Sequence, residues 1–212
     1  DNIEKPVSLV PLVKTDKKIA REEERVSIDV DYPQFANVPP AINSDIKKFA
    51  ESEIENIDSL KLAEIPTSSN ATYFLKINYE IEQSNTDYLS LVFTVNLYTG
   101  GAHPNEYFKT FNYDVRTGAP ILLAGLYPEN ATVLEILKPK IAKAVRDSLV
   151  DTLRINGDNT SNPDELLFEP IASLDPELFE NFTFGSEYIT FYFSPYDIAP
   201  YAAGPIVAKI ER

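Results

Sequence analysis

YFLKINYEIEQSNTDYLSLVFTVNLY, residues 73–98, is the stretch that decides the fold of this 212-residue chain. Apolar and polar residues alternate through its first part, and the apolar residues return at every second position from residue 89. A period of two is typical of strands with one buried face. The intervening QSNTD is rich in turn-forming residues. The sequence therefore predicts two long strands, 73–82 and 88–98, that pair as a hairpin at the centre of a sheet.

Further strands are expected on both sides of this hairpin. The same alternation occurs before Pro33 in RVSIDVDYPQF, and Gly118 follows a third long strand as the residue that supplies a positive φ to its turn. The flanking strands are expected at residues 26–32, 106–115, 181–193 and 205–210.

Two segments have the apolar spacing of amphipathic helices. The first is 39–61, for which Asn43 or Ser44 can provide the N-cap. The second is 121–153, and we expect its regular part to begin near Pro139, because proline costs least in a first turn.

The resulting order is strand, helix, three strands, helix, two strands. It predicts an α+β fold with an antiparallel meander and two amphipathic helices packed on one face, or the same elements as two small subdomains. Residues 1–24 are a lead-in or linker that is either poorly ordered or a short edge strand. We expect an N-terminal part at 25–84 and a C-terminal part at 85–212 that share the sheet.

The composition restricts the function. The 33 acidic and 19 basic residues give a net charge of −14, which opposes binding to nucleic acid or to an anionic membrane surface. A cationic partner is favoured, and solubility alone is the other explanation of this charge. The absence of cysteine excludes disulfides and thiolate chemistry.

Catalytic motifs are missing from the sequence. His103 is the only histidine, so sites built from several histidines are excluded, and a Ser-His-Asp triad would need His103 without a G-x-S-x-G elbow. No P-loop or dinucleotide fingerprint occurs. We therefore expect binding rather than catalysis, with no catalytic residue, metal or cofactor. Four glycosylation sequons occur, at Asn70, Asn130, Asn159 and Asn181.

A proline-rich loop stands out near the C-terminus. The stretch FSPYDIAPYAAGP, residues 193–205, has a proline at every fifth position, with Tyr196 and Tyr201 beside Pro195 and Pro200. Because each proline fixes φ and lacks a backbone donor, this segment is expected to be a stiff loop. Its tyrosines either fold back over the end of the sheet or contact a partner.

Residues 98–127 and 180–210 resemble a bacterial extracytoplasmic domain family of unknown function. The resemblance is carried by GGAH after a strand, by FNYD closed by a Thr-Gly turn, and by YDIAPYAAGP. This family occurs in RsiV, the lysozyme-sensing anti-sigma factor, and in the non-catalytic part of the peptidoglycan deacetylase PdaC. YPQF and AINSDIKKF in the first half are similar to the companion domain that usually precedes it.

The resemblance implies an α+β domain in the cell envelope that is secreted or is anchored by an N-terminal helix or lipid outside this sequence. It implies a non-catalytic domain that binds a cationic protein such as lysozyme, as a sensor or inhibitor, or else cell-wall glycan. A hydrolase with unrecognised carboxylates is the third class. The residues expected to form the binding edge are Tyr196, Pro200, Tyr201, Pro195, His103 and Gly101.

Overall fold

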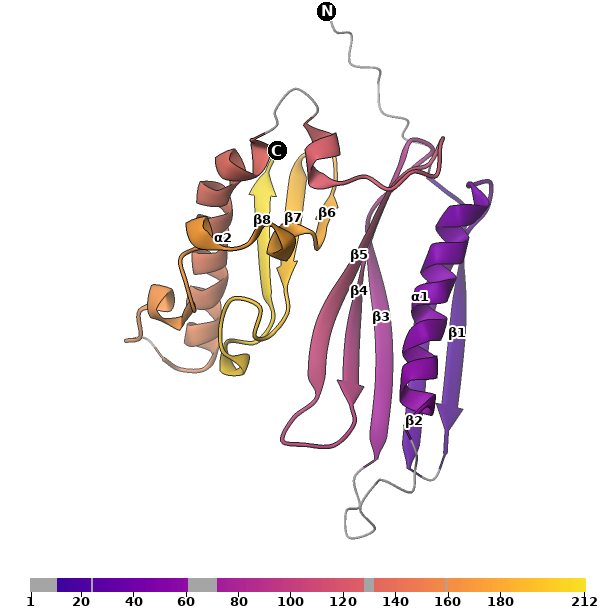
Figure 1. The fold of residues 1–212 in the computed structure, drawn as a ribbon, viewed down its shortest axis with the longest axis horizontal. Coiled ribbons are helices and arrows are strands. Elements are labelled where there is room, and N and C mark those ends of the chain that lie inside the picture. The colour runs from indigo at the N-terminus through magenta and orange to yellow at the C-terminus, as the bar shows by residue number, and fades with distance from the viewer. Residues whose placement is uncertain (1–10, 24, 61–71, 128–131, 159) are drawn as a thin grey trace, which may run out of the picture.

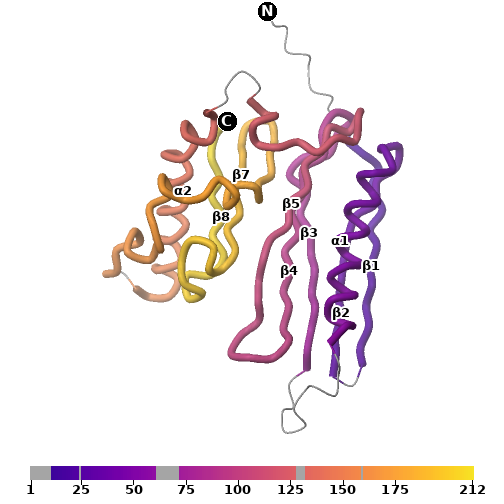
Figure 2. Tube along the Cα trace, in the orientation of Figure 1, coloured from indigo at the N-terminus to yellow at the C-terminus, as the bar shows by residue number. Residues whose placement is uncertain are grey.

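The structure is a computed structural model that describes residues 11–23, 25–60, 72–127, 132–158 and 160–212. The chain forms two β-sheets, and each sheet is covered by one long helix (Figure 1). In the tube of Figure 2, the indigo-to-magenta residues build the larger sheet and the orange-to-yellow residues build the smaller half beside it. The layers run in the order α2, smaller sheet, larger sheet, α1, because the two sheets meet through the faces that their helices leave open. The α+β class predicted from the sequence is confirmed.

The larger sheet has five strands in the order β1-β2-β3-β4-β5. Their bounds are Lys14–Glu22 for β1, Val26–Phe35 for β2, Tyr73–Ser84 for β3, Tyr88–Tyr98 for β4 and Asn105–Asp114 for β5. Strands β3, β4 and β5 form the expected antiparallel meander. Strands β2 and β3 pair in parallel, because the helix α1 (Pro40–Asp58) lies between them in the chain and carries it back to the same end of the sheet.

Strand β4 is buried on both faces. Leu91 and Phe93 pack with α1 in one core, as the alternation predicts, whereas Ser90 and Val92 on the other face are also buried. The smaller sheet covers this second face, with contacts from β6 to β4 and β5. A period of two shows which residues share a face, but it does not show that a second layer covers the polar one.

Helix α1 begins without a side-chain cap. Pro39 is its N-cap and Pro40 its first residue, so the expected caps Asn43 and Ser44 lie inside the helix. Asn43 instead bonds the end of β2: its Oδ1 accepts from the Phe35 N–H at 2.9 Å and its Nδ2 donates to the Phe35 carbonyl at 2.8 Å. Proline suits the first helical position, because the N–H that it lacks would have no partner within the helix.

Helix α2 spans Val133–Ile155 and contains Pro139 in its second turn. The prediction that the regular helix begins near Pro139 is therefore wrong. The apolar stripe reaches back to Val133, which is buried together with Leu137 and Ile141. Burying two further apolar side chains outweighs the backbone hydrogen bond that Pro139 cannot make.

The smaller sheet consists of β6 (Phe182–Phe184), β7 (Tyr188–Phe193) and β8 (Ile206–Glu211), all antiparallel. Helix α2 covers its outer face, so the two long helices cover different sheets and not one common face. Short 3₁₀ segments connect the regular elements: Leu123–Leu126, Pro163–Leu166, Ile171–Ser173, Pro176–Phe179 and Tyr201–Ala203.

Part of the lead-in is a strand, β1, which pairs along its whole length with β2 at the edge of the larger sheet. The expected division between residues 84 and 85 lies in the turn between β3 and β4, so both expected parts contribute strands to that sheet. Gly118 has the predicted positive φ, 76°. The sequons at Asn70, Asn130 and Asn159 lie outside the described residues.

Candidate functional site

The proline-rich loop, residues 193–205, begins at the last residue of β7, leads to β8 and packs against the turn between β4 and β5. The Tyr201 ring stacks on the His103 imidazole, with ring centroids 3.6 Å apart and planes at 19°. The Tyr201 hydroxyl donates to the Pro104 carbonyl at 3.0 Å. The structure thus joins two candidate segments that are far apart in the sequence, and one of the two tyrosines is half-buried between them.

Tyr196 is the exposed member of this group. Its side chain is 58% exposed, and its ring centroid lies 5.8 Å from that of Tyr201 and 6.3 Å from that of His103. Its φ is +74°, a conformation that residues with a side chain seldom adopt. Such strain persists only where surrounding contacts hold it, and it is concentrated at functional positions.

Hydrogen bonds within the loop hold Tyr196 in this conformation. Its N–H donates to the Ala199 carbonyl at 3.1 Å. On the other side, the Ser194 N–H donates to Asp197 Oδ2 at 2.6 Å, and the Asp197 N–H donates back to the Ser194 carbonyl at 3.0 Å. Ile198 and Ala199 are buried below the loop and anchor it to the core. The loop is therefore held in one conformation by its own hydrogen bonds and by the core.

The β4–β5 turn is shaped by two glycines. Gly100 and Gly101 have φ values of +96° and +107°, which glycine adopts without steric cost. The Tyr98 hydroxyl donates to the Gly101 carbonyl at 3.0 Å. His103 Nδ1 lies 3.0 Å from the Pro104 carbonyl oxygen, a contact that requires Nδ1 to carry the proton and leaves Nε2 as the acceptor in the neutral ring.

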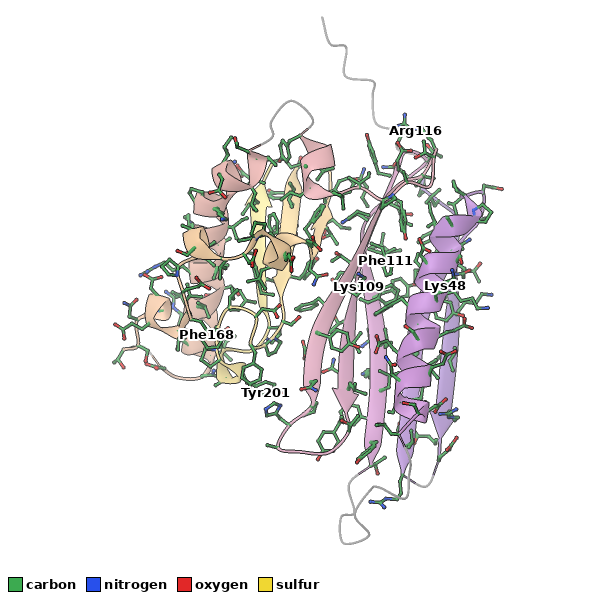
Figure 3. All side chains as sticks on the ribbon, in the orientation of Figure 1. Lys48, Lys109, Phe111, Arg116, Phe168 and Tyr201 are labelled. Atoms are coloured by element: carbon green, nitrogen blue, oxygen red, sulfur yellow. The ribbon has the colours of Figure 1, made fainter. Side chains whose placement is uncertain are left out.

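Phe168 adds an aromatic side chain that the sequence analysis missed. Its side chain is 58% exposed, and its N–H donates to the Ile198 carbonyl at 3.0 Å, which ties it to the proline-rich loop. Figure 3 shows Phe168 and Tyr201 at the same end of the smaller half. No local pattern indicates this position, because Phe168 lies in an irregular segment between 3₁₀ turns. We call His103, Phe168, Tyr196 and Tyr201 the aromatic rim.

Two carboxyl groups near the rim have raised pKa values. Burial raises the pKa of Asp197, within the loop, and also that of Glu106, near the start of β5. The remaining candidates lie around the rim: Pro195 is half-buried, whereas Pro200 and Gly101 are exposed.

The described ranges contain neither a metal centre nor a membrane-spanning helix. The described residues contain no group of three or more His, Cys, Asp or Glu side chains placed to hold a metal ion. None of the helices in the described part of the chain is long and apolar enough to cross a membrane.

Comparison with protein families gives two matches that follow one another along the chain. Residues 19–106 match the family described as Deacetylase PdaC, and residues 126–212 match a protein family of unknown function, DUF3298. The second match includes α2, the smaller sheet and the proline-rich loop. The first match includes the β4–β5 turn and ends at the second residue of β5. The two segments of the aromatic rim thus come from different family matches.

Two curated relatives extend the comparison. The chain is 26% identical over 170 residues to the peptidoglycan-N-acetylmuramic acid deacetylase PdaC of Bacillus subtilis, covering 80% of this chain and 34% of the deacetylase. It is 27% identical over 113 residues to an esterase of Mycobacterium tuberculosis, covering 53% of this chain and 44% of the esterase. The chain therefore spans less than half the length of both relatives.

A solved structure supports the fold over nearly the whole chain. The crystal structure of a DUF3298 family member from Bacteroides fragilis aligns with a TM-score of 0.61 and 17% sequence identity, covering 94% of this chain and 90% of that one. At this identity the likeness concerns the fold alone.

Proposed function

We propose that this chain is a non-catalytic, extracytoplasmic binding domain that recognises a cationic protein of the lysozyme type through its aromatic rim. The observation that carries the proposal is the pairing of two loops: the strained, exposed Tyr196 projects beside a Tyr201 that is locked onto His103. The matches to PdaC support a location in the cell envelope, because the relative's named substrate, peptidoglycan, is a cell-wall polymer.

The rim has the properties of a preorganised contact surface. A loop held by prolines and internal hydrogen bonds loses little conformational entropy on binding. Tyrosine offers a large apolar area with a polar tip and has few rotatable bonds, which suits insertion into a partner's cleft. Tyr196 thus provides the contact, and the stack of Tyr201 on His103 keeps its support rigid.

Charge favours a basic partner. The chain carries a net charge of −14, and a field of this sign steers cationic proteins toward the surface. Steering of this kind raises association rates by roughly 10- to 1000-fold at low salt. Binding is therefore expected to weaken as salt concentration rises.

Calorimetric titration with a c-type lysozyme, at low and at moderate salt, tests the proposal. We expect sub-micromolar binding that Tyr196→Ala weakens by at least about tenfold, the effect of losing one well-packed aromatic contact. Tyr188→Ala is the matched control, since Tyr188 is half-buried at the opposite end of β7 from the loop and should leave binding unchanged. Absence of heat at both salt concentrations, or equal loss in both variants, would refute recognition through the rim.

Cell-wall glycan is the second candidate partner. It is favoured by the match of residues 19–106 to the PdaC family and by the exposed Phe168 and Tyr196, because sugar rings pack on aromatic faces. In that case, soluble peptidoglycan fragments would bind weakly and without strong salt dependence. Phe168→Ala would then reduce glycan binding as much as Tyr196→Ala does.

A further inference from the structure

Strand β5 leaves part of its backbone unpaired at the edge of the larger sheet. It is the last strand in the order, and its partner β4 occupies one side only. The Asn112 carbonyl accepts from the Ile121 N–H at 2.8 Å, and the Asp114 N–H donates to the Ala119 carbonyl at 3.0 Å. The backbone hydrogen-bonding groups of Asn112 and Asp114 therefore point away from β4. Since the direction alternates along a strand, the backbone of Thr110 points the same way.

Another segment of the chain pairs with the end of this β5 edge. Residues 119–121 run antiparallel to the end of β5, with a bridge between Tyr113 and Pro120. The chain then turns away into the 3₁₀ segment Leu123–Leu126. Over the described ranges, no backbone partner continues this pairing to Thr110, and the next outward N–H, that of Phe108, lies a long 3.4 Å from Ser194 Oγ.

A cleft of about 640 Å³ lies along this stretch of β5. Lys109 and Phe111 are among the β5 residues that line it, and Figure 3 shows both on the side of the strand that faces α1. The opposite walls come from the segment around Leu122, from the start of α2 and from the 3₁₀ segment Pro176–Phe179. The volume lies within the range of ligand-binding clefts, and Leu122, 70% exposed, leaves an apolar side chain at its wall.

Charge selects among possible occupants. Glu177 and Glu180 line the wall opposite β5, whereas the Lys109 ammonium lies 5.7 Å from the centroid of the Phe111 ring, which packs on Phe49 of α1. This acidic wall, on a chain of net charge −14, disfavours an acidic ligand and suits one with a basic side chain. The cleft has apolar walls, an unpaired strand edge and the two glutamates. An extended peptide matches these features better than a sugar does, because a sugar has no backbone donors and acceptors at strand spacing.

We propose that this cleft binds an extended peptide that adds a strand to β5 at Thr110, with an apolar residue held near Leu122 and a neighbouring basic residue facing Glu177 and Glu180. Backbone hydrogen bonds supply the affinity, and the contacts with Leu122, Glu177 and Glu180 supply the specificity. The site is separate from the aromatic rim and does not depend on its function.

The test uses blocked, fluorescein-labelled pentapeptides that place Val, Leu, Ile or Phe before Lys or Arg, titrated into the full chain. Fluorescence anisotropy should show binding, and nitrogen-15 NMR should show the Thr110 amide signal shifting, with slower hydrogen exchange. Leu122→Glu should weaken binding by about tenfold or more, as expected when a charge is placed at an apolar contact. Val207→Glu, a change at an exposed apolar residue of β8, should have no effect.

Two further comparisons separate strand pairing from nonspecific adsorption. Methylating alternate backbone nitrogens of the peptide should abolish binding for one of the two alternating sets only, because one set faces β5. Glu180→Gln should weaken binding about two- to fivefold, the value of an exposed ion pair. No binding by any of the peptides, an unmoved Thr110 signal, or equal binding by both methylated sets would overturn the proposal. Tyr196→Ala should leave peptide binding intact, which keeps this test independent of the rim.

Discussion

Each half of the molecule has an apolar core between one helix and one sheet, whereas the contact between the two halves is largely polar. The larger half packs α1 on the five-stranded sheet through an apolar core that contains Phe93, and the smaller half packs α2 on its sheet through a core that contains Phe191. Between the two sheets the buried groups are largely polar and include Ser90, Asn112 and Thr183. Apolar burial therefore stabilises each half, whereas directional contacts orient one half on the other.

The joint between the halves is a short chain of buried hydrogen bonds. Ser90 Oγ donates to Asn112 Oδ1 at 2.6 Å and accepts from the Phe184 N–H at 2.9 Å, while Asn112 Nδ2 donates to the Phe182 carbonyl at 2.8 Å. All these groups are satisfied by residues of the opposite half or by each other. Because hydrogen bonds are directional, this joint determines how the proline-rich loop meets the β4–β5 turn.

The largest expected effect tests whether the two cores unfold together. Phe191→Ala and Phe93→Ala each remove a fully buried ring, and each should lower the free energy of unfolding by about 3–5 kcal/mol. We expect one urea transition in both variants, followed by circular dichroism and tyrosine fluorescence, because the joint couples the halves. Two separated transitions in Phe191→Ala would show that the halves are independent.

The joint itself is tested by Asn112→Ala. This change removes the side-chain donor to the Phe182 carbonyl and the acceptor of the Ser90 hydroxyl proton, which should lower the free energy of unfolding by about 1–3 kcal/mol. Asn96→Ala, at a half-buried position of the adjacent strand β4, should change it by about 0.5 kcal/mol or less. Equal effects in the two variants would argue against a structural role for the polar joint.

The two helices differ in where each places its proline. Pro40 begins α1, whereas Pro139 lies in the second turn of α2. Pro139→Ala restores a helical N–H and should raise the free energy of unfolding by about 1–2 kcal/mol, while Pro40→Ala should change it by about 0.5 kcal/mol or less. Denaturation midpoints measure both, and a loss of stability in Pro139→Ala would show that the helix needs the proline.

The smallest expected effect is a difference in pH response between two aspartates. Bonding to Arg116 holds the pKa of Asp114 in the larger half below its ordinary value of 3.8, so its stabilisation is present above that pH and is lost as pH falls. Burial raises the pKa of Asp197 in the smaller half, so stability is lost as pH rises through its folded-state pKa.

The corresponding asparagine variants should therefore respond in opposite directions. Between about pH 3 and about pH 7, Asp114→Asn should lose stability relative to the unmodified chain as pH rises, and Asp197→Asn should gain it. Unfolding midpoints across this range provide the measurement. Parallel pH curves for the two variants would contradict the assigned environments.

Much of the local structure could be predicted from the sequence. The β3–β4 hairpin follows from a period of two across a polar turn, and the buried stripe of α2 follows from helical spacing. The start of α2 could not be predicted, because the propensity of Pro139 is a local cost and the burial of Val133 is a tertiary gain. The second buried face of β4 was missed for the same reason.

Part of the candidate site could likewise be predicted from the sequence, and part depends on the tertiary structure. By itself, the sequence determined that residues 193–205 form a stiff loop bearing two tyrosines, because proline fixes φ whatever surrounds it. Only the tertiary structure decided that Tyr201 stacks on His103, that Tyr196 stays exposed, that the Phe168 N–H bonds the same loop and that β5 keeps an unpaired edge. These features depend on how two separately formed cores dock, and docking is set by contacts between residues far apart in the chain, which leave no periodic pattern in it.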